Sequence, residues 1–381
     1  MADKMKTKEY FLKMVAAIIC EQPVPVYSED ISLEHLYKLS VKNSVQGILY
    51  LAVKNGNIPV SDGLEKHLQG LYMSNLMRDA AQDAERELIG KEFSEAGIDY
   101  MFLKGSHLKK LYPIPEIRYM VDMDVLIKKE NLESGCQILL DNGFKQYMDN
   151  VKDVIFTKMP NITVELHQML FIDDYFMHEH FLDVWGKAEQ TTEYEYKMSD
   201  NDLYVYTLAH LAEHYLDGGS CFRPTMDLFL MERKLGDVLD FDYINKRFKA
   251  IGIDKFAEKV RQLYNCMFAD GKYNDDLTTM ENYIVFGAPV KDVSAVAKVA
   301  SSKQSKLSRI ITTLFPKYTH MVARYPELKR LPFLLPFFWL KRIFRLLFTK
   351  NVGMINKRKN LINTNTESVA IMRDIFEKSG F

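Results

Sequence analysis

The sequence has few cysteines, and none of them lie close together. Four cysteines are spread over 381 residues, so the chain has neither the Cys-x-x-Cys spacing of a zinc site nor the dense pattern of a disulfide framework. It also lacks an uninterrupted apolar run of about 18 residues, which a membrane-spanning helix requires. The apolar segment Tyr10–Cys20 contains Lys13 and has no small-residue cleavage site, so we do not expect an export signal. These absences predict a cytoplasmic protein that is not integral to a membrane.

The chain also lacks a net charge of either sign, because a basic segment balances an acidic remainder. The 50 Lys and Arg residues and the 51 Asp and Glu residues give a net charge of −1. Residues 301–360 contain 14 Lys or Arg and a single acidic residue, Glu327. We expect this segment either to pack as a helix with a solvated basic side or to contact a polyanion or an anionic membrane surface weakly. Membrane contact would place the protein at the inner face of the membrane. No stable nucleic-acid partner is expected, because aromatic and basic residues are not interleaved in the rest of the chain.

The length of the chain predicts more than one domain, and its hydrophobic pattern divides it into four parts. Residues 1–60 and 199–300 carry apolar residues at helical spacing. Between them, residues 61–198 alternate strand-like and helical segments. Residues 301–381 contain the basic amphipathic segment. We therefore expect an α+β protein whose mixed β-sheet core is flanked by helices, with helical regions at both ends.

The expected strands are short and are separated by turn residues or helices. They are Ile98–Leu103, Met120–Ile127, Phe144–Tyr147, Val154–Thr157 and Ile162–Leu166. A long helix is expected to begin at the capping pair Asp62 and Glu65 and to stop at Gly97. A shorter helix is expected over Asn131–Asn142. The helices expected in the second helical region are Leu203–Tyr215, Thr225–Leu235, Tyr243–Ala250 and Lys255–Phe268.

Four side chains with metal-binding chemistry occupy alternating positions on two expected strands. Asp122 and Asp124 project from one face of their strand, among apolar neighbours where an unpaired carboxylate would be costly to bury. Glu165 and His167 form a second same-face pair on a later strand. Carboxylates bind hard cations such as Mg²⁺, so Asp122, Asp124 and Glu165 are the candidate catalytic residues and metal ligands. Glu165 would bind a second ion or take the acceptor's proton, and His167 would support the cofactor site rather than bind an ion directly.

A Gly-Ser turn precedes the two aspartates. Gly105 would let the backbone approach a phosphate closely, and the Ser106 hydroxyl with nearby backbone amides can hold phosphate oxygens. Lys104 and Arg118 would supply positive charge to a leaving pyrophosphate. Each residue alone is more typical of an ordinary turn or a surface charge. Together with the carboxylates, they favour metal-dependent nucleotidyl transfer.

The order of these motifs resembles that of a known family. Leu-Lys-Gly-Ser at 103–106, Tyr112-Pro113, Arg118, Asp122-Met-Asp124-Val-Leu-Ile and Val-Glu-Leu-His at 164–167 are similar to the uncharacterised bacterial nucleotidyltransferase family of the polymerase-beta-like superfamily. The resemblance implies the minimal nucleotidyltransferase fold, two Mg²⁺ ions and a nucleoside triphosphate, with ATP as the expected one. Two features depart from the superfamily pattern. The gap from Gly105 to Asp122 is long, and the third carboxylate is a glutamate followed two residues later by a histidine.

The expected reaction moves a nucleoside monophosphate from the triphosphate to an unidentified hydroxyl or phosphate acceptor and releases pyrophosphate. The alternative is a catalytically inactive nucleotide-binding or protein-interaction module on the same fold. His210 and His214, four residues apart on an expected helix, form either a packed pair or part of a metal site. Arg223 and Asp227 form either an ion pair at a helix start or groups that face the cleft.

Overall fold

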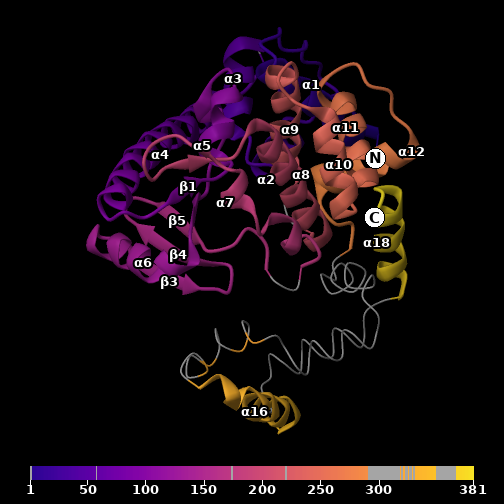
Figure 1. Ribbon diagram of the computed structural model, residues 1–381. Coiled ribbons are helices and arrows are strands. Elements are labelled where there is room, and N and C mark those ends of the chain that lie inside the picture. The colour runs from indigo at the N-terminus through magenta and orange to yellow at the C-terminus, as the bar shows by residue number, and fades with distance from the viewer. Residues whose placement is uncertain are drawn as a thin grey trace. The chain divides into compact units, whose positions relative to one another are not determined.

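The computed structural model describes residues 2–56, 58–172, 175–218, 221–290, 331–348 and 366–381, with single residues at 318, 321, 325 and 328 (Figure 1). The chain divides into two compact units. The first unit comprises Met1–Tyr215, Gly219–Gly287 and Lys378–Phe381, and the second comprises Leu216–Gly218 and Ala288–Glu377. Every predicted site residue belongs to the first unit. The finer division of the sequence into four parts stays a prediction.

Four helices precede the sheet. They are α1 (Ala2–Ile19), α2 (Leu33–Lys42), α3 (Gln46–Gly56) and α4 (Asp62–Glu95). Serine side chains cap the N-termini of α2 and α4. Ser32 accepts a hydrogen bond from the backbone N–H of His35, and Ser61 accepts one from that of Leu64. The long helix predicted to begin at Asp62 is therefore confirmed, although its capping side chain is Ser61.

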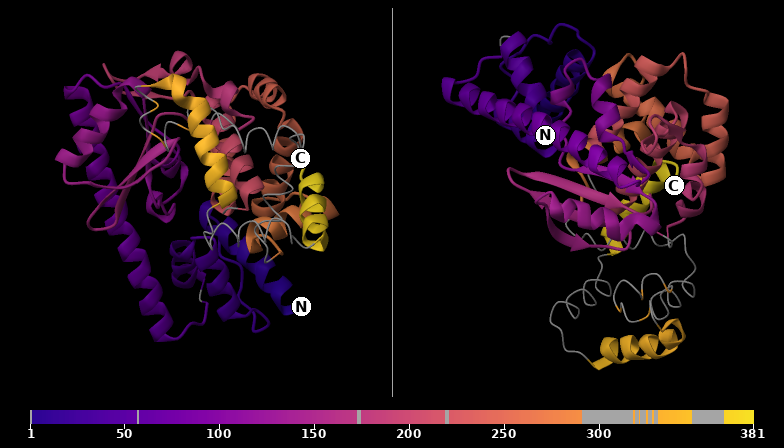
Figure 2. Two further views of the ribbon diagram at one scale, coloured as in Figure 1. Left: turned by 90° about the horizontal axis from the view of Figure 1, so that it is seen from below. Right: turned by 60° about the vertical axis from the view of Figure 1, so that its left-hand side comes forward.

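Helix α4 connects the N-terminal helices to the sheet (Figure 2). Near its start, Tyr72 packs on Tyr50 of α3 with ring centroids 5.1 Å apart. Near its end, Ile89 and Phe93 enter the core of the sheet. Gly97 follows with a φ of +68°, a left-handed conformation that glycine adopts readily and that ends the helix as predicted.

The sheet is mixed, as predicted, with strand order β1-β2-β5-β4-β3. Its strands are β1 (Tyr100–Phe102), β2 (Met123–Ile127), β3 (Lys145–Asp149), β4 (Asp153–Lys158) and β5 (Ile162–His167). Strands β2 and β5 run parallel, whereas the other neighbouring pairs are antiparallel. The fold is therefore α+β.

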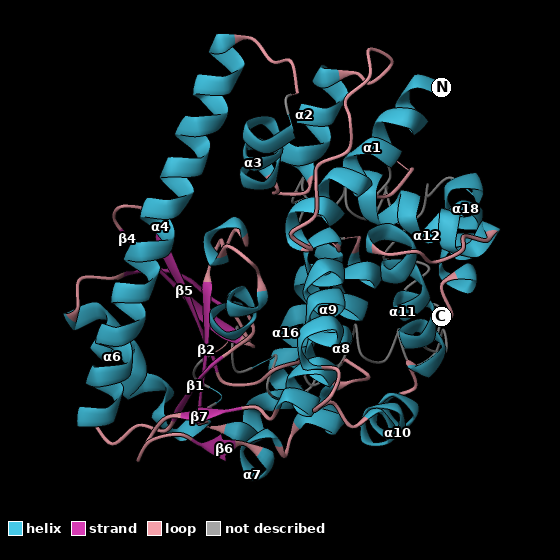
Figure 3. Cartoon of the chain, turned by 90° about the horizontal axis from the view of Figure 1, so that it is seen from above, coloured by secondary structure: helices cyan, strands magenta, loops and turns pink. Residues whose placement is uncertain are grey.

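One face of the sheet is apolar and packs against helices α4 and α6 (Leu132–Asp141) (Figure 3). The alternating residues of β2 and β5 that enter this core are Met123, Val125, Ile127, Ile162, Val164 and Leu166. Because successive strand residues point to opposite faces, Asp124, Glu165 and His167 project from the other face. That face is turned toward α8 and α9 (Figure 3).

The second helical region follows the sheet in sequence. Its helices are α8 (Asp200–Asp217), α9 (Phe222–Leu235), α10 (Phe241–Ile251), α11 (Asp254–Phe268) and α12 (Asp275–Phe286). The four predicted helices are confirmed, and α8 and α9 each begin three residues earlier than expected. Helix α12 was not predicted, although Asn274 caps it by accepting a hydrogen bond from the backbone N–H of Leu277.

The connection from β1 to β2 differs from the prediction. The Gly-Ser turn is the first turn of α5 (Gly105–Leu108), and two short 3₁₀ helices, η1 (Lys109–Leu111) and η2 (Pro115–Ile117), follow it. Strand β2 begins at Met123, so the expected strand start at Met120 is wrong. The reason is that side chains from α4 and α9 bind the backbone carbonyls here. Arg223 donates to the carbonyl oxygen of Tyr119, and Gln82 donates to that of Met120 at 3.4 Å.

Only part of the basic segment falls within the described residues. That part contains η7 (Pro332–Leu334) and α16 (Leu335–Phe348), and α18 (Thr366–Lys378) follows after a gap. Most of the expected segment 301–360 lies outside the described residues. Within the part of the chain that the structure describes, no helix is both long enough and apolar enough to span a bilayer.

Candidate active site

The acidic residues of β2 and β5 meet because these strands run parallel and in register. Asp124 and Glu165 are direct Cα partners across the strand pair. His167, two residues along β5, points to the same face. Its Nε2 lies 3.0 Å from Asp124 Oδ1 and 3.5 Å from Glu165 Oε2. One ligand atom from each of the three residues lies within 4.8 Å of the other two, which is the spacing of ligands around a single divalent ion.

The three side chains differ in burial and in charge. His167 is 3% exposed, against 18% for Asp124 and 25% for Glu165. Burial would lower the pKa of His167, but hydrogen bonds to Asp124 and Glu165 outweigh burial and raise it. Burial would raise the pKa of Asp124, but Lys104 and His167 hold it well below its usual range. Asp124 is therefore the carboxylate that keeps its negative charge.

Asp122 lies beside this group rather than within it. It precedes β2, and among the described residues the converging metal-binding group does not include it. Burial, followed by the charges of Asp124 and Glu165, raises the pKa of Asp122 to about 6, while Arg223 and Lys104 oppose the shift. The two aspartates that the sequence pairs thus have different environments.

Lys104 contacts the acidic group from the start of α5. Its Nζ lies 3.7 Å from Asp124 Oδ2 and 5.0 Å from the centroid of the Tyr206 ring. Burial lowers the pKa of Lys104 to about 8, although Asp124 opposes this shift. The predicted cation is therefore at the site, and in this structure its partner is a carboxylate.

Gly105 and Ser106 form the first turn of α5, directly after Lys104. A Cβ on Gly105 would lie 2.9 Å from Met120 Sδ and 3.3 Å from Arg118 Nη1, so a larger residue would fit here only if these side chains shifted. The Ser106 side chain is buried. The turn is thus close to Arg118, as the sequence predicts.

Arg118 is held by a protein carboxylate. Its Nε and Nη2 donate to the two oxygens of Asp227 in α9, each at 2.7 Å. The Tyr112 hydroxyl donates to the same carboxylate at 2.8 Å. Asp227 therefore pairs with Arg118 rather than forming the ion pair with Arg223 that was one of the two alternatives. Arg223 donates instead to the backbone carbonyl of Tyr119.

One face of α8 is turned toward the acidic group and carries Tyr206, His210 and His214. The two imidazole rings are 4.3 Å apart in a T-shaped arrangement, which accords with a packed pair. Burial and the charge of Lys104 lower the pKa of His214 to about 4 and that of His210 well below its usual range. Both rings are therefore neutral near pH 7. Tyr206 was not predicted, although its spacing of four residues from His210 places it on the same helical face.

Three further polar residues near the site were not predicted. Lys152 Nζ lies 3.9 Å from Glu213 Oε2 of α8. Asp153, the first residue of β4, is the Cα partner of His167 across the antiparallel pair. No short motif marks these residues, because they come together only through strand register and helix packing.

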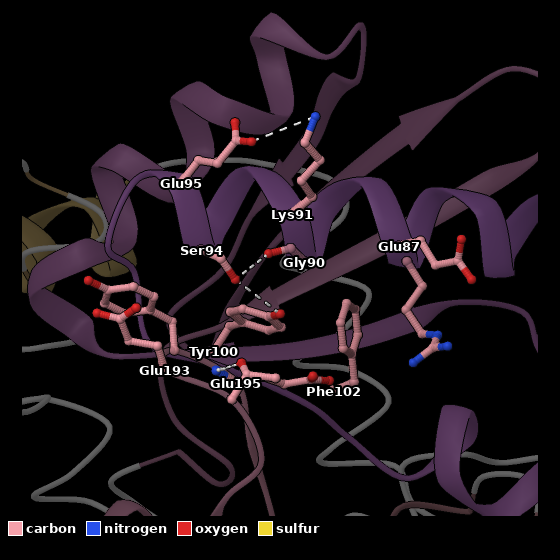
Figure 4. A pocket seen from close by; sticks show the side chains of 12 residues that line it. Glu87, Gly90, Lys91, Ser94, Glu95, Tyr100, Phe102, Glu193 and Glu195 are labelled. Atoms are coloured by element: carbon pink, nitrogen blue, oxygen red, sulfur yellow. Dashed lines mark hydrogen bonds and ion pairs between the residues drawn. The ribbon is translucent and has the colours of Figure 1, made fainter.

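A pocket of about 600 Å³ lies elsewhere in the first unit (Figure 4). It is bounded by α4, β1 and the loop between β6 (Glu189–Gln190) and β7 (Tyr196–Lys197). Ser94 of α4 faces Tyr100 of β1 across it, with their hydroxyl oxygens 3.5 Å apart. Asp124, Glu165 and His167 do not line this pocket. The chemistry of the candidate site is therefore inferred from these three side chains and not from the pocket.

The side chains of the cluster fit a divalent cation. Asp124 and Glu165 offer anionic oxygens and His167 offers a nitrogen, all within the spacing given above. The buried His167 Nδ1 has no hydrogen-bond partner among the described residues. Asp122 supplies a further carboxylate close by. These four residues would hold the metal ions that nucleotidyl transfer requires.

Comparison with known proteins confirms the family. A sequence model of the uncharacterised nucleotidyltransferase family matches residues 29–269. This range extends from before α2 to the end of α11 and includes every predicted site residue. The chain belongs to this family and is an enzyme of the class that transfers phosphorus-containing groups. No curated protein and no solved structure matches the chain.

Proposed function

We propose that the chain is a Mg²⁺-dependent nucleotidyltransferase of the bacterial, polymerase-beta-like kind. It would move a nucleoside monophosphate from a nucleoside triphosphate, with ATP as the expected donor, to a hydroxyl or phosphate acceptor and release pyrophosphate. The observation that carries the proposal is the in-register pairing of Asp124 and Glu165 on parallel strands, with His167 between their carboxylates. Family membership supports nucleotidyl transfer.

Each site residue has a role in this proposal. Divalent ions held by Asp122, Asp124 and Glu165 would neutralise the triphosphate and activate the attacking oxygen. Lys104 would bind phosphate oxygens at the start of α5, together with Gly105 and Ser106. Arg118 Nη1 would contribute there as well, because it lies beside Gly105.

The chemical step forms one bond and breaks another. The acceptor oxygen bonds to the α-phosphorus, and the bond from that phosphorus to the bridging oxygen breaks, so pyrophosphate leaves. Glu165 would take the acceptor's proton, a role that is supported by its being the most exposed of the three clustered side chains. Lys104 faces the same carboxylates and would balance the negative charge of the departing pyrophosphate.

The test uses ATP labelled at either the α- or the γ-phosphate, with Mg²⁺ and fractionated small-molecule and macromolecular acceptors. Nucleotidyl transfer moves only the α-label to the acceptor and releases pyrophosphate. The double variant Asp122→Ala plus Asp124→Ala should lose both signals while its circular dichroism spectrum is unchanged. Normal pyrophosphate release by this variant would show that the site is assigned wrongly.

A nucleotide-binding or protein-interaction module without catalysis is the second candidate. It is favoured by Lys104, whose Nζ lies 3.7 Å from Asp124 Oδ2 and neutralises a carboxylate that would otherwise bind metal. Isothermal titration with ATP, with and without Mg²⁺, separates the two candidates when it is paired with the label-transfer assay. Tight binding without labelled product would favour the module.

A further inference from the structure

The most buried of the three clustered side chains is His167 rather than either carboxylate. His167 Nε2 is directed between Asp124 and Glu165, at 3.0 Å and 3.5 Å from their nearest oxygens. It approaches Asp124 at Oδ1, whereas Lys104 approaches the same carboxylate at Oδ2. The imidazole nitrogen and the two carboxylates therefore converge on one point. Lys104 contacts only Oδ2 of Asp124, so Oδ1 can face that point.

The other imidazole nitrogen is buried and has no hydrogen-bond partner among the described residues. His167 Nδ1 lies 3.7 Å from Oδ2 of Asp153. Asp153 is itself buried, and the side-chain amide of Asn150 donates to its Oδ1 at 2.8 Å. Strand register brings the two residues together, because Asp153 and His167 are Cα partners. The Asp153 carboxylate, the His167 imidazole and the carboxylates of Asp124 and Glu165 thus form a line.

Such a line is the usual environment of a histidine that binds a metal. A ligating histidine donates its second ring N–H to a carboxylate, and this partner fixes the tautomer and the orientation of the ring. A metal ion would displace the Nε2 proton that Asp124 and Glu165 otherwise accept, and a proton on Nδ1, directed toward Asp153, would leave the lone pair of Nε2 for that ion. At 3.7 Å the contact between Nδ1 and Asp153 is electrostatic and longer than a hydrogen bond, so the carboxylate would orient the ring through its charge.

We propose that His167 binds a metal ion directly through Nε2, that Asp153 is its positioning residue, and that this ion is a first-row transition ion such as Mn²⁺ in preference to Mg²⁺. Mg²⁺ favours an all-oxygen environment, whereas imidazole nitrogen favours transition ions, and two carboxylates beside it suit Mn²⁺. The inference rests on the proposed function only in treating this cluster as the metal site. The Mg²⁺ of the proposed reaction would then enter with the triphosphate at Asp122.

The test is electron paramagnetic resonance on the full chain with Mn²⁺ and without nucleotide. Pulsed spectra of bound Mn²⁺ show a ¹⁴N modulation when an imidazole nitrogen is a ligand. We expect this modulation in the unmodified protein and its loss in His167→Gln, which keeps a side chain of similar size. The matched control is His210→Gln, since His210 is also a buried histidine close to Asp124, and it should keep the modulation.

Metal titration gives a second measurement. Mn²⁺ should bind the unmodified protein at least about tenfold more tightly than Mg²⁺, and Asp153→Asn should weaken Mn²⁺ binding about 10–100-fold while the ¹⁴N modulation remains. An unchanged affinity in Asp153→Asn would overturn its positioning role. Absence of Mn²⁺ binding, a spectrum without ¹⁴N modulation, or loss of the modulation in His210→Gln would overturn the assignment of His167.

Two features keep the test decisive. The spectrum of the unmodified protein settles nitrogen ligation even if His167→Gln does not fold, which circular dichroism would reveal. The measurements also use no triphosphate. Pyrophosphate release supported by Mg²⁺ without a nitrogen signal would therefore overturn this inference alone, whereas a nitrogen signal without label transfer would count against the proposed function alone.

Discussion

Arg118 and Asp227 lie 109 residues apart in the sequence and form a buried, bidentate ion pair. Their side chains are 7% and 3% exposed, and the planar guanidinium matches the carboxylate with two parallel hydrogen bonds. The pair fastens the segment that leads to Asp122 onto α9. An arginine that the sequence pattern assigns to phosphate is thus also a structural link between the sheet and the second helical region.

Removing the charge of Asp227 should destabilise the protein strongly. In Asp227→Asn, Arg118 would stay buried without its counter-charge, and we expect the free energy of unfolding to fall by about 3–5 kcal/mol. Urea unfolding followed by circular dichroism measures this change. The control is Asp237→Asn, since Asp237 is exposed just beyond α9, and its effect should stay within about 0.5 kcal/mol. Equal losses in the two variants would contradict the role of the pair.

Gly105→Ala should destabilise the first turn of α5. The new Cβ would lie 2.9 Å from Met120 Sδ and 3.3 Å from Arg118 Nη1, so we expect a loss of about 1–3 kcal/mol from overpacking. Gly63→Ala is the matched control, because a Cβ on Gly63 in α4 would meet nothing within 4 Å. It should stabilise the protein by up to about 1 kcal/mol, since alanine favours helix more than glycine does. Thermal unfolding compares the two variants, and a stabilised Gly105→Ala would refute the packing argument.

Glu232 of α9 should make stability depend on pH. Burial would raise its pKa, but hydrogen bonds from Arg261 and Tyr264 outweigh burial and hold the pKa below its usual range. Because the folded pKa is lower than the unfolded value of about 4.3, the stabilising contribution is present above that pH and is lost as the pH falls through the folded pKa. The difference in unfolding free energy between the unmodified protein and Glu232→Gln should therefore be largest near pH 7 and should shrink below about pH 4. Urea titrations across this range test the prediction, which a constant difference would contradict.

The basic segment 301–360 is proposed to contact anionic membrane surfaces weakly. In its described part, Phe333 and Phe337 are exposed, so apolar and basic groups are both available. Vesicles containing phosphatidylserine should co-sediment the full chain at low salt, and higher salt should reduce the effect. Replacing Lys341, Arg342 and Arg345 by glutamine should weaken binding by about two orders of magnitude, at about 1 kcal/mol for each charge.

The control for the membrane experiment removes the same charge elsewhere. A triple glutamine variant of the exposed lysines Lys129, Lys145 and Lys272 should bind the vesicles nearly as well as the unmodified protein. Equal weakening by both triple variants would indicate a general charge effect. No sedimentation with anionic vesicles at low salt would end the proposal, and binding to a soluble polyanion alone would point to a different partner.

Local pattern was sufficient to predict the strands of the site and the face on which Asp124, Glu165 and His167 lie. Alternation of apolar and polar residues encodes that face, because one side of the sheet must be buried. Pattern could not predict that β2 and β5 run parallel in a register that makes Asp124 and Glu165 partners. Register depends on contacts between segments far apart in sequence.

The errors have the same origin. Asp122 was placed on the strand with Asp124, but side chains from α4 and α9 bind the preceding backbone, so the strand starts at Met123. The ion pair between Arg118 and Asp227 was not predicted, because Asp227 is too distant in sequence to suggest itself as a partner. Long-range partners of this kind have no signature in a short motif.

The link between Arg118 and Asp227 bears on how the molecule can be divided. Excising residues 61–198 as a minimal catalytic fragment would remove Asp227, the partner of Arg118, and Tyr206, the ring beside Lys104, and would expose the face of the sheet that carries both cations. We expect such a fragment to be less stable than the whole chain. Any shortened enzyme derived from this chain must retain α8 and α9 as well as the sheet.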